Sequence, residues 1–181
     1  MNTIEYERKQ ILTLDEYNML ITRLNEIVDC NEVIQVNYYF DDNNYSLCDK
    51  GDTLRVRQKS GRLSLERKFN KRYSTNGVRI CDESNEDIHN LPMKIVIGDN
   101  KFYYIGNLMT VRKNYKIDDN TISLDASYYL GKIDYEVEIE SDKEVTIPEF
   151  VSKIIKFNRY QGGKYNRFVR KLKEKQLEYK I

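Results

Sequence analysis

Two short stretches near opposite ends of the chain carry carboxylates at alternating positions. Their charged residues are Glu5, Glu7 and Lys9 in the first stretch, and Glu136, Glu138 and Glu140 in the second. If each stretch is a β-strand, its alternate side chains share one face of that strand. Carboxylates held that close repel one another unless a cation or a shared proton compensates their charge. Both faces therefore require a metal ion, opposing basic side chains or open water, and together they suggest one site assembled across the fold.

Carboxylates are the expected ligands of any metal in this chain, because histidine is almost absent. His89 is the only histidine, and it lies in a loop-like stretch before Pro92 where a surface position is expected. Histidine-rich zinc sites and most Ser-His-Asp or Cys-His mechanisms are therefore not expected. Oxygen ligands favour Mg²⁺ or Mn²⁺ over Zn²⁺.

Length and composition predict one domain over residues 1–181. The chain has 30 basic and 29 acidic residues, and its net charge of +1 gives no reason to expect a nucleic-acid partner. Its three cysteines lack a CxxC spacing, which suits reduced thiols in the cytoplasm. Since no long apolar run or N-terminal apolar segment appears, we expect no membrane partner. The expected oligomeric state is a monomer or a homodimer.

Hydrophobic periodicity predicts strands interleaved with a few helices. Strands are expected over residues 3–11, 33–40, 53–60, 62–69, 77–81, 103–117, 122–126 and 132–141. Helices are expected over 147–157, over 164–179, and from a capping box formed by Thr13 and Glu16 to about residue 29. The ambiguous stretch 84–98 is assigned two short helices.

Most of these strands combine a charged face with an apolar face. In the expected hairpin, Arg55 and Arg57 lie opposite Leu54 and Val56. The helices need an apolar surface to cover, so the apolar faces should point outward. The charged faces then meet inside, as in a closed barrel with a polar tunnel. The alternative is an ordinary sheet whose charged faces meet water.

The expected inner face carries nearly balanced charge. Its acidic members are Glu5, Glu7, Glu66, Glu136, Glu138 and Glu140, and its basic members are Lys9, Arg55, Arg57, Lys59, Lys68 and Arg112, with Lys164 at a mouth. Burying unpaired charge costs on the order of several kcal/mol per ion, so this balance makes a wet, charged interior tolerable. An acidic end beside a basic end could hold a divalent cation beside a polyanion.

The charged motifs resemble, in order along nearly the whole chain, those of the CYTH superfamily, the triphosphate tunnel metalloenzymes. The matching segments are Glu5-x-Glu7-x-Lys9, Tyr39-Phe40-Asp41, Leu54-Arg55-Val56-Arg57, Leu65-Glu66-Arg67-Lys68, Glu136-x-Glu138-x-Glu140 and Lys164-Tyr165-x-Arg167, with Arg112 in a basic strand. The chain looks similar to short bacterial members of the Gram-positive type. The resemblance implies an α+β fold, a closed eight-stranded antiparallel β-barrel with flanking helices. Two departures stand out: Glu66 replaces a commoner Thr or Lys, and the segment around Arg79 matches poorly.

The resemblance also implies residue roles. The metal ligands for Mg²⁺ or Mn²⁺ would be Glu5, Glu7, Glu136 and Glu138. The substrate-binding residues would be Lys9, Arg55, Arg57, Lys59, Lys68, Arg112 and Lys164. The catalytic residues would be Lys9, Glu138 and Glu140, with one of the two glutamates accepting a proton.

The expected reaction is metal-dependent hydrolysis of a triphosphate-containing small molecule, with inorganic triphosphate as the preferred substrate. Thiamine triphosphatase activity and class IV-type adenylate cyclase activity are alternatives within the family. Non-catalytic binding of polyphosphate or nucleotides is the alternative from another functional class.

Overall fold

The computed structural model describes residues 2–74, 78–141, 145–158 and 162–178, with only the backbone described for residues 2–5. Its strands and helices are β1 (Asn2–Leu12), α1 (Leu14–Asn25), β2 (Asn31–Asp41), α2 (Ser46–Lys50), β3 (Thr53–Lys59), β4 (Arg62–Tyr73), β5 (Arg79–Ile88), β6 (Lys94–Ile97), β7 (Asn100–Ile117), β8 (Asn120–Tyr129), β9 (Lys132–Ser141), α3 (Glu149–Ile154) and α4 (Lys164–Glu178).

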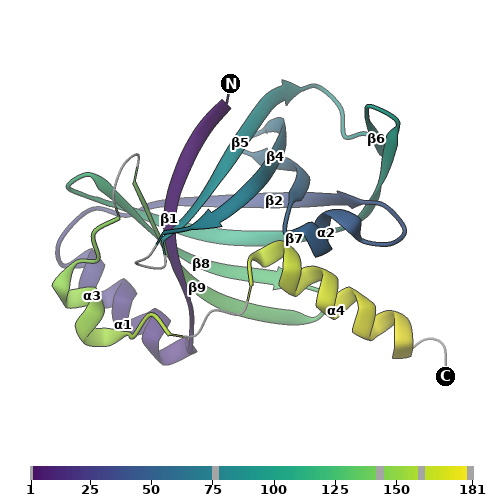
Figure 1. The fold of residues 1–181 in the computed structure, drawn as a ribbon. Helices are drawn as coiled ribbons and strands as arrows, with labels where there is room; N and C mark the ends of the chain where they lie inside the picture. The colour runs from purple at the N-terminus through teal and green to yellow at the C-terminus, as the bar shows by residue number, and fades with distance from the viewer. Residues whose placement is uncertain (1, 75–77, 142–144, 159–161, 179–181) are drawn as a thin grey trace.

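The strands form a closed antiparallel barrel. In the described residues, eight strands pair in the order β2-β3-β4-β5-β1-β9-β8-β7, and β7 pairs back with β2. The remaining strand, β6, extends the sheet from β7 outside this ring. Figure 1 shows α1 and α3 together at one end of the barrel and α4 at the other. The predicted eight-stranded antiparallel β-barrel with flanking helices is confirmed.

Apolar side chains of β8 and β9 pack against α1 and α3, as the periodicity predicts. Val137 and Ile139 of β9 are buried in a cluster that also contains Leu20 and Leu24 of α1 and Val151 of α3. Burying one such side chain stabilises a fold by about 1.5–3 kcal/mol. Because side chains alternate along a strand, the glutamates of β9 are left to face the barrel interior.

A capping box fixes the start of α1. The Thr13 hydroxyl accepts a hydrogen bond from the Glu16 N–H at 3.2 Å, and the Glu16 carboxylate accepts one from the Thr13 N–H at 2.7 Å. This arrangement satisfies two donors that a helix N-terminus otherwise leaves without partners, and it confirms the predicted start. The helix ends at Asn25, earlier than predicted, and the Ile27 N–H bonds to the Leu24 carbonyl at the tighter three-residue spacing.

Gly106 of β7 allows α4 to pack directly on the barrel. Tyr165 and Phe168 of α4 are buried in one cluster with Tyr39 of β2 and Leu108 of β7. A Cβ atom at Gly106 would lie 2.6 Å from Phe168 Cζ, and Gly106 has a φ of +139°. Glycine alone meets both conditions without strain. This close packing positions the first turn of α4 against the barrel.

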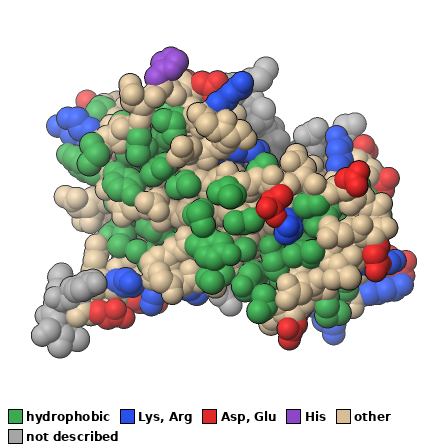
Figure 2. All heavy atoms as spheres, turned by 180° about the vertical axis from the view of Figure 1, so that it is seen from behind, with side chains coloured by type: hydrophobic (Ala, Val, Ile, Leu, Met, Phe, Trp, Pro, Cys, Tyr) green, Lys and Arg blue, Asp and Glu red, His purple; other side chains and the backbone are tan. Residues whose placement is uncertain are grey.

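One face of the barrel keeps apolar side chains at the surface. Ile34 of β2, Met109 of β7 and Tyr128 of β8 are all exposed. Met109 lies opposite Tyr128 in the β7–β8 register. Figure 2, the view from behind Figure 1, shows apolar side chains gathered across the middle of that face. None of the helices in the described ranges is long and apolar enough to cross a bilayer.

Several element boundaries differ from the sequence predictions. Residues 84–98 do not form two helices, because β5 runs to Ile88 in register with β4 and β6 pairs with β7. Tertiary strand pairing has overridden the local helical pattern there. The hairpin of β3 and β4 is confirmed, with β4 extending to Tyr73, while the predicted helix over 147–157 is the shorter α3. Residue 77, where a strand was predicted to begin, and residue 179, where a helix was predicted to end, lie outside the described residues.

Candidate functional site

The barrel encloses a strongly charged cavity of about 410 Å³. Its described lining contains nine basic side chains, Lys9, Arg55, Arg57, Lys59, Lys68, Lys71, Arg79, Arg112 and Lys164. Five acidic side chains also line it, Glu7, Glu66, Glu83, Glu138 and Glu140. The positive surplus suits a polyanion, and the carboxylates suit a cation bound beside it.

Strand register gathers the carboxylates at one end of this cavity. Lys9 of β1 lies opposite Glu138 of β9, and Glu7 lies opposite Glu140. On the other side of β9, Glu136 lies opposite Asp125 of β8. Residues that are directly opposite in a sheet have their side chains on the same face, so these five carboxylates and Lys9 point inward together.

The carboxylates form two groups that share Glu138. Oxygen atoms of Glu7, Glu138 and Glu140 all lie within 4.8 Å of one another, and the same holds for Asp125, Glu136 and Glu138. Three carboxylates converging at this spacing are a suitable donor set for Mg²⁺ or Mn²⁺, which prefer oxygen ligands. The first group borders the cavity, whereas Glu136 lies behind it.

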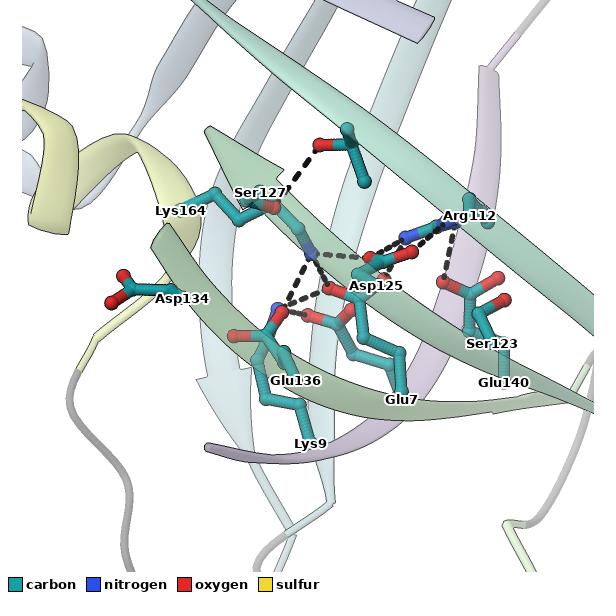
Figure 3. A network of polar contacts seen from close by, with 12 residues as sticks. Glu7, Lys9, Arg112, Ser123, Asp125, Ser127, Asp134, Glu136, Glu140 and Lys164 are labelled. Carbon is teal, nitrogen blue, oxygen red and sulfur yellow. Dashed lines mark hydrogen bonds and ion pairs between the residues drawn. The ribbon is translucent and has the colours of Figure 1, made fainter. Parts of the chain in front are cut away.

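Cationic side chains compensate the buried acids. Lys164 Nζ lies 2.7 Å from Asp125, 2.6 Å from Glu136 and 2.7 Å from Glu138. Arg112 donates to both oxygens of Asp125, at 2.7 and 2.6 Å, and also contacts Glu138. Figure 3 shows Lys164 reaching from the start of α4 into the carboxylates. The acidic cluster is thus held together from β7, β8, β9 and α4.

These cations keep the carboxyl groups ionised. Burial alone would raise the pKa of Glu138, but the charges of Lys164 and Arg112 outweigh it and hold that pKa well below its usual range. Asp125 behaves in the same way, because Arg112 and Lys164 lower its pKa against the effect of burial. Ionised carboxylates are the form that binds a metal ion.

Lys9 joins the two sides of the acidic end. Its Nζ lies 2.8 Å from Glu7 and 3.6 Å from Glu138. Glu7 also contacts Arg79 of β5 and is almost fully buried. The Glu7 Oε1 atom accepts no hydrogen bond of regular geometry, although both cations lie within ion-pair distance. This incompletely satisfied oxygen is consistent with a metal-ligand position.

Glu66 organises the basic wall on the opposite side. Its Oε2 lies 2.7 Å from Arg55 Nη2 and 3.4 Å from Arg57 Nη1, while Ser64 donates to its Oε1 at 3.0 Å. Burial favours protonation, but Arg55 and Arg57 lower the pKa of Glu66 to about 2. Burial and the charge of Arg55 lower the pKa of Arg57 to about 10. The acid that interrupts the family pattern therefore orients two arginines.

The structure brings most of the predicted site residues together. Glu7, Lys9, Arg55, Arg57, Lys68, Arg112, Glu138, Glu140 and Lys164 all line the cavity. Lys59 also lines it but is exposed at the surface. Glu136 contacts Lys164 and Arg167 rather than the first carboxylate group. The Glu5 side chain lies outside the described residues, although its backbone pairs with Cys81.

Four charged residues of the cavity or of the carboxylate groups were not placed on the inner face by the sequence analysis: Asp125, Arg79, Glu83 and Lys71. Asp125 alternates with Ser123 and Ser127, which are buried polar residues of β8, so the alternation could have identified it. Glu83 lay outside the predicted strand 77–81, which ended too early, whereas Arg79 lay inside that strand but in a segment that matched the family pattern poorly.

Comparisons with known proteins agree with this geometry. The chain is 29% identical over 148 residues to "Putative triphosphatase YjbK" of Bacillus subtilis, covering 76% of this chain and 77% of that protein. A crystal structure of a "putative adenylate cyclase" from Bacillus halodurans superposes with a TM-score of 0.69 at 24% identity, covering 92% of this chain and 98% of that one. A Hippeastrum structure, described as a "putative adenylyl cyclase" with "a dominant" triphosphatase activity, superposes with a TM-score of 0.60 at 21% identity, over 85% and 84% of the two chains. Since the CYTH domain model matches residues 3–172, nearly the whole chain, the protein belongs to the CYTH domain family.

Proposed function

We propose that this protein is a cytoplasmic, divalent-metal-dependent triphosphatase whose substrate is inorganic triphosphate. The observation that carries the proposal is the single cavity in which the carboxylates of Glu7, Glu138 and Glu140 adjoin a wall of basic side chains. Such a cavity can bind a metal ion at one end and a phosphate chain along its length. The B. subtilis relative named as a triphosphatase supports the same reaction class.

The basic residues would bind and align the phosphate chain. Arg55, Arg57 and Arg112 present planar guanidinium groups that match pairs of phosphate oxygens. Lys9 of β1 and Lys68 of β4, the two strands on either side of β5, add ammonium groups. Together they would stabilise the charge that develops on the transferred phosphoryl group.

The carboxylates would hold the metal and receive a proton. Mg²⁺ or Mn²⁺ bound by Glu7, Glu138 and Glu140 would supply Lewis-acid neutralisation of phosphate charge. Glu138 is a poor base, because Lys164 and Arg112 keep its pKa well below the usual range. We therefore assign proton acceptance to Glu140, through the carboxylate oxygen that does not bind the metal. Water oxygen bonds to the terminal phosphorus, the bridging P–O bond breaks, pyrophosphate leaves, and the water proton passes to Glu140.

The lining of the cavity favours a substrate without a large organic group. Tyr39 and Tyr165 are its only aromatic side chains among the described residues, and no aliphatic side chain lines it. A nucleobase or a thiamine ring would find little apolar surface there. This composition favours inorganic triphosphate over ATP and thiamine triphosphate.

A substrate panel tests the proposal. Purified protein is assayed with Mg²⁺ or Mn²⁺ for phosphate release from inorganic triphosphate, thiamine triphosphate and ATP, and for cyclic AMP formation from ATP. We expect inorganic triphosphate to be the best substrate. Formation of cyclic AMP from ATP would instead support the adenylate cyclase alternative. Binding of triphosphate without turnover would support the non-catalytic alternative.

Glu138→Gln is the matched active-site variant. It preserves the shape of the side chain but removes the charge shared by both carboxylate groups, so we expect activity to fall by about 100-fold or more while the fold persists. Glu86→Gln, an exposed change on β5, is the control and should keep wild-type activity. Full activity in Glu138→Gln would refute the metal-site assignment.

A further inference from the structure

A β-bulge in β4 turns an unexpected lysine into the cavity. Strict alternation from the inward-facing Lys68 would place Asn70 and Arg72 inside. Instead, Phe69 lies opposite Asp82 and Arg72 opposite Ile80, so β4 carries one extra residue over this interval. Asn70 has a φ of +54°, which accommodates the irregularity. Bulges of this kind redirect side chains and are frequent beside active sites.

The bulge exchanges the positions of two basic residues. Lys71 lines the cavity, while Arg72 is directed outward and lies 3.3 Å from the exposed-side carboxylate of Asp82. Without the extra residue, Arg72 would face the cavity and Lys71 would face outward. The irregular backbone therefore has a specific effect on the charge of the cavity wall.

Unlike most of the cavity cations, Lys71 has no acidic partner at ion-pair distance among the described residues. Seven of the nine basic lining residues lie within ion-pair distance of a carboxylate. Within the described part of the chain, Lys59 and Lys71 have no such partner and no side-chain hydrogen bond. Lys59 is exposed to water, which solvates its charge, whereas Lys71 is half-buried. Lys71 is thus the cavity ammonium whose charge is least compensated.

Burial is the largest influence on the charge of Lys71, and neighbouring groups of both signs act on it. Burial and the charge of Lys9 lower its pKa to about 8, with Lys68 acting in the same direction and with Cys81 and Asp52 opposing. Its stem runs past Gly51, where a Cβ atom would lie 3.8 Å from Nζ. A half-buried ammonium group with no carboxylate at ion-pair distance in the described residues gains from an anion that supplies counter-charge.

We propose that Lys71 is a further substrate-binding residue, whose ammonium group binds a phosphoryl oxygen in the part of the cavity influenced by both Lys9 and Lys68. The identity of the ligand as a triphosphate rests on the proposed function. The binding itself rests on the bulge, the burial of the side chain and the absence of an acidic partner in the described residues.

Calorimetric titration with inorganic triphosphate in the presence of a chelator tests this role without turnover. Loss of one hydrogen bond to a charged group weakens binding by about tenfold or more, so Lys71→Met should show at least that loss. Lys71→Arg keeps the charge and should recover most of the affinity. Lys101→Met, an exposed change on β7, is the matched control and should bind as wild type does.

Proton uptake provides a second readout. At about pH 9 the Lys71 amine of the unliganded protein is largely neutral. Binding of an anion favours the charged ammonium form, so the protein should take up a proton on binding. Calorimetric titrations in buffers of different ionisation enthalpy measure this uptake. Lys71→Met should lose that uptake. Affinity within twofold of wild type for Lys71→Met, unchanged proton uptake, or no triphosphate binding by the wild type would overturn the inference.

The two proposals fail separately. A wild-type protein that binds triphosphate through Lys71 but releases no phosphate with metal would refute the triphosphatase and leave this inference standing. An active triphosphatase whose Lys71→Met variant binds normally would do the opposite. Thermal unfolding of each variant confirms that binding is measured on folded protein.

Discussion

Glu66 illustrates how an acid can serve a phosphate-binding wall. Its carboxylate contacts both Arg55 and Arg57, and Arg57 is held from its other side by Asn37 at 3.0 Å. Without the acid, two guanidinium groups on neighbouring positions of β3 would repel each other in a poorly solvated interior. The residue that departs from the family pattern is therefore a positioning residue for two cations.

Replacing Glu66 should make the protein less stable at neutral pH and change its acid sensitivity. The folded-state pKa is about 2 and the unfolded value about 4.3, so the carboxylate stabilises the fold above about pH 4.3 and loses that effect as the pH falls towards 2. We expect Glu66→Gln to lower the free energy of unfolding at about pH 7 by on the order of 3 kcal/mol. Urea unfolding at a series of pH values measures the effect.

The difference between wild type and variant should shrink in acid. Wild-type protein loses stability between about pH 4.3 and pH 2 through this group, whereas Glu66→Gln has no such proton to gain. Glu86→Gln serves again as an exposed control and should follow the wild-type profile. Parallel pH profiles for wild type and Glu66→Gln would contradict the assigned ion pairs.

Residue-level prediction from sequence succeeds where alternation is regular. Glu7, Lys9 and Glu138 were predicted to face one cavity, and regular pairing of β1 with β9 places them there. Lys71 could not be predicted, because an extra residue in β4 reverses the face on which it lies. A bulge depends on the partner strand, so its position is not encoded in the local pattern.

At the scale of elements, the docking of α4 depends on one glycine. We expect Gly106→Ala to lower the free energy of unfolding by about 1–3 kcal/mol, because the new methyl group would meet Phe168 at 2.6 Å on a backbone with positive φ. Chemical denaturation measures this loss. Since Lys164 begins the same helix, activity should fall with the loss of docking.

A double-mutant cycle separates the two causes of that loss. In a Phe168→Ala background the steric part disappears, so Gly106→Ala should cost less there than in the wild type. The backbone part should remain. An equal cost in both backgrounds would mean that contact with Phe168 plays no role in the requirement for glycine.

Element-level prediction fails where long-range pairing decides the structure. The stretch 84–98 has a locally helical pattern, yet Leu63 pairs with Ile88 and Ile95 with Phe102 across strands. Local sequence periodicity carries no information about which distant residues will pair across strands. By contrast, the start of α1 is set within four residues by Thr13 and Glu16, and it was predicted correctly.

For the molecule as a whole, the distribution of charge matters more than its sum. The described lining of the cavity has nine basic and five acidic side chains, whereas the whole chain carries a net charge of only +1. The positive charge is therefore concentrated inside the barrel, where low solvent access strengthens its field. The sequence argument that helices cover the apolar faces correctly predicted that the charged faces point inward, because it concerns whole faces rather than single contacts. It predicted nearly balanced charge there, whereas the described lining carries a positive surplus, since Lys71 and Arg79 were not counted on the inner face.

This concentration of charge predicts a salt-sensitive stabilisation by the substrate anion. Inorganic triphosphate without added metal should raise the thermal unfolding midpoint, since a ligand at a hundredfold excess over its Kd stabilises the native state by about 2.7 kcal/mol. Raising the NaCl concentration from about 0.05 M to about 0.5 M should reduce the shift, because mobile ions screen the partly solvated cavity. Sulfate at equal ionic strength should give a smaller shift, because its shorter charge array cannot reach from the acidic end to Arg55 and Arg57 together. An equal shift with sulfate, or one that salt leaves unchanged, would mean that an extended phosphate chain is not what the cavity recognises.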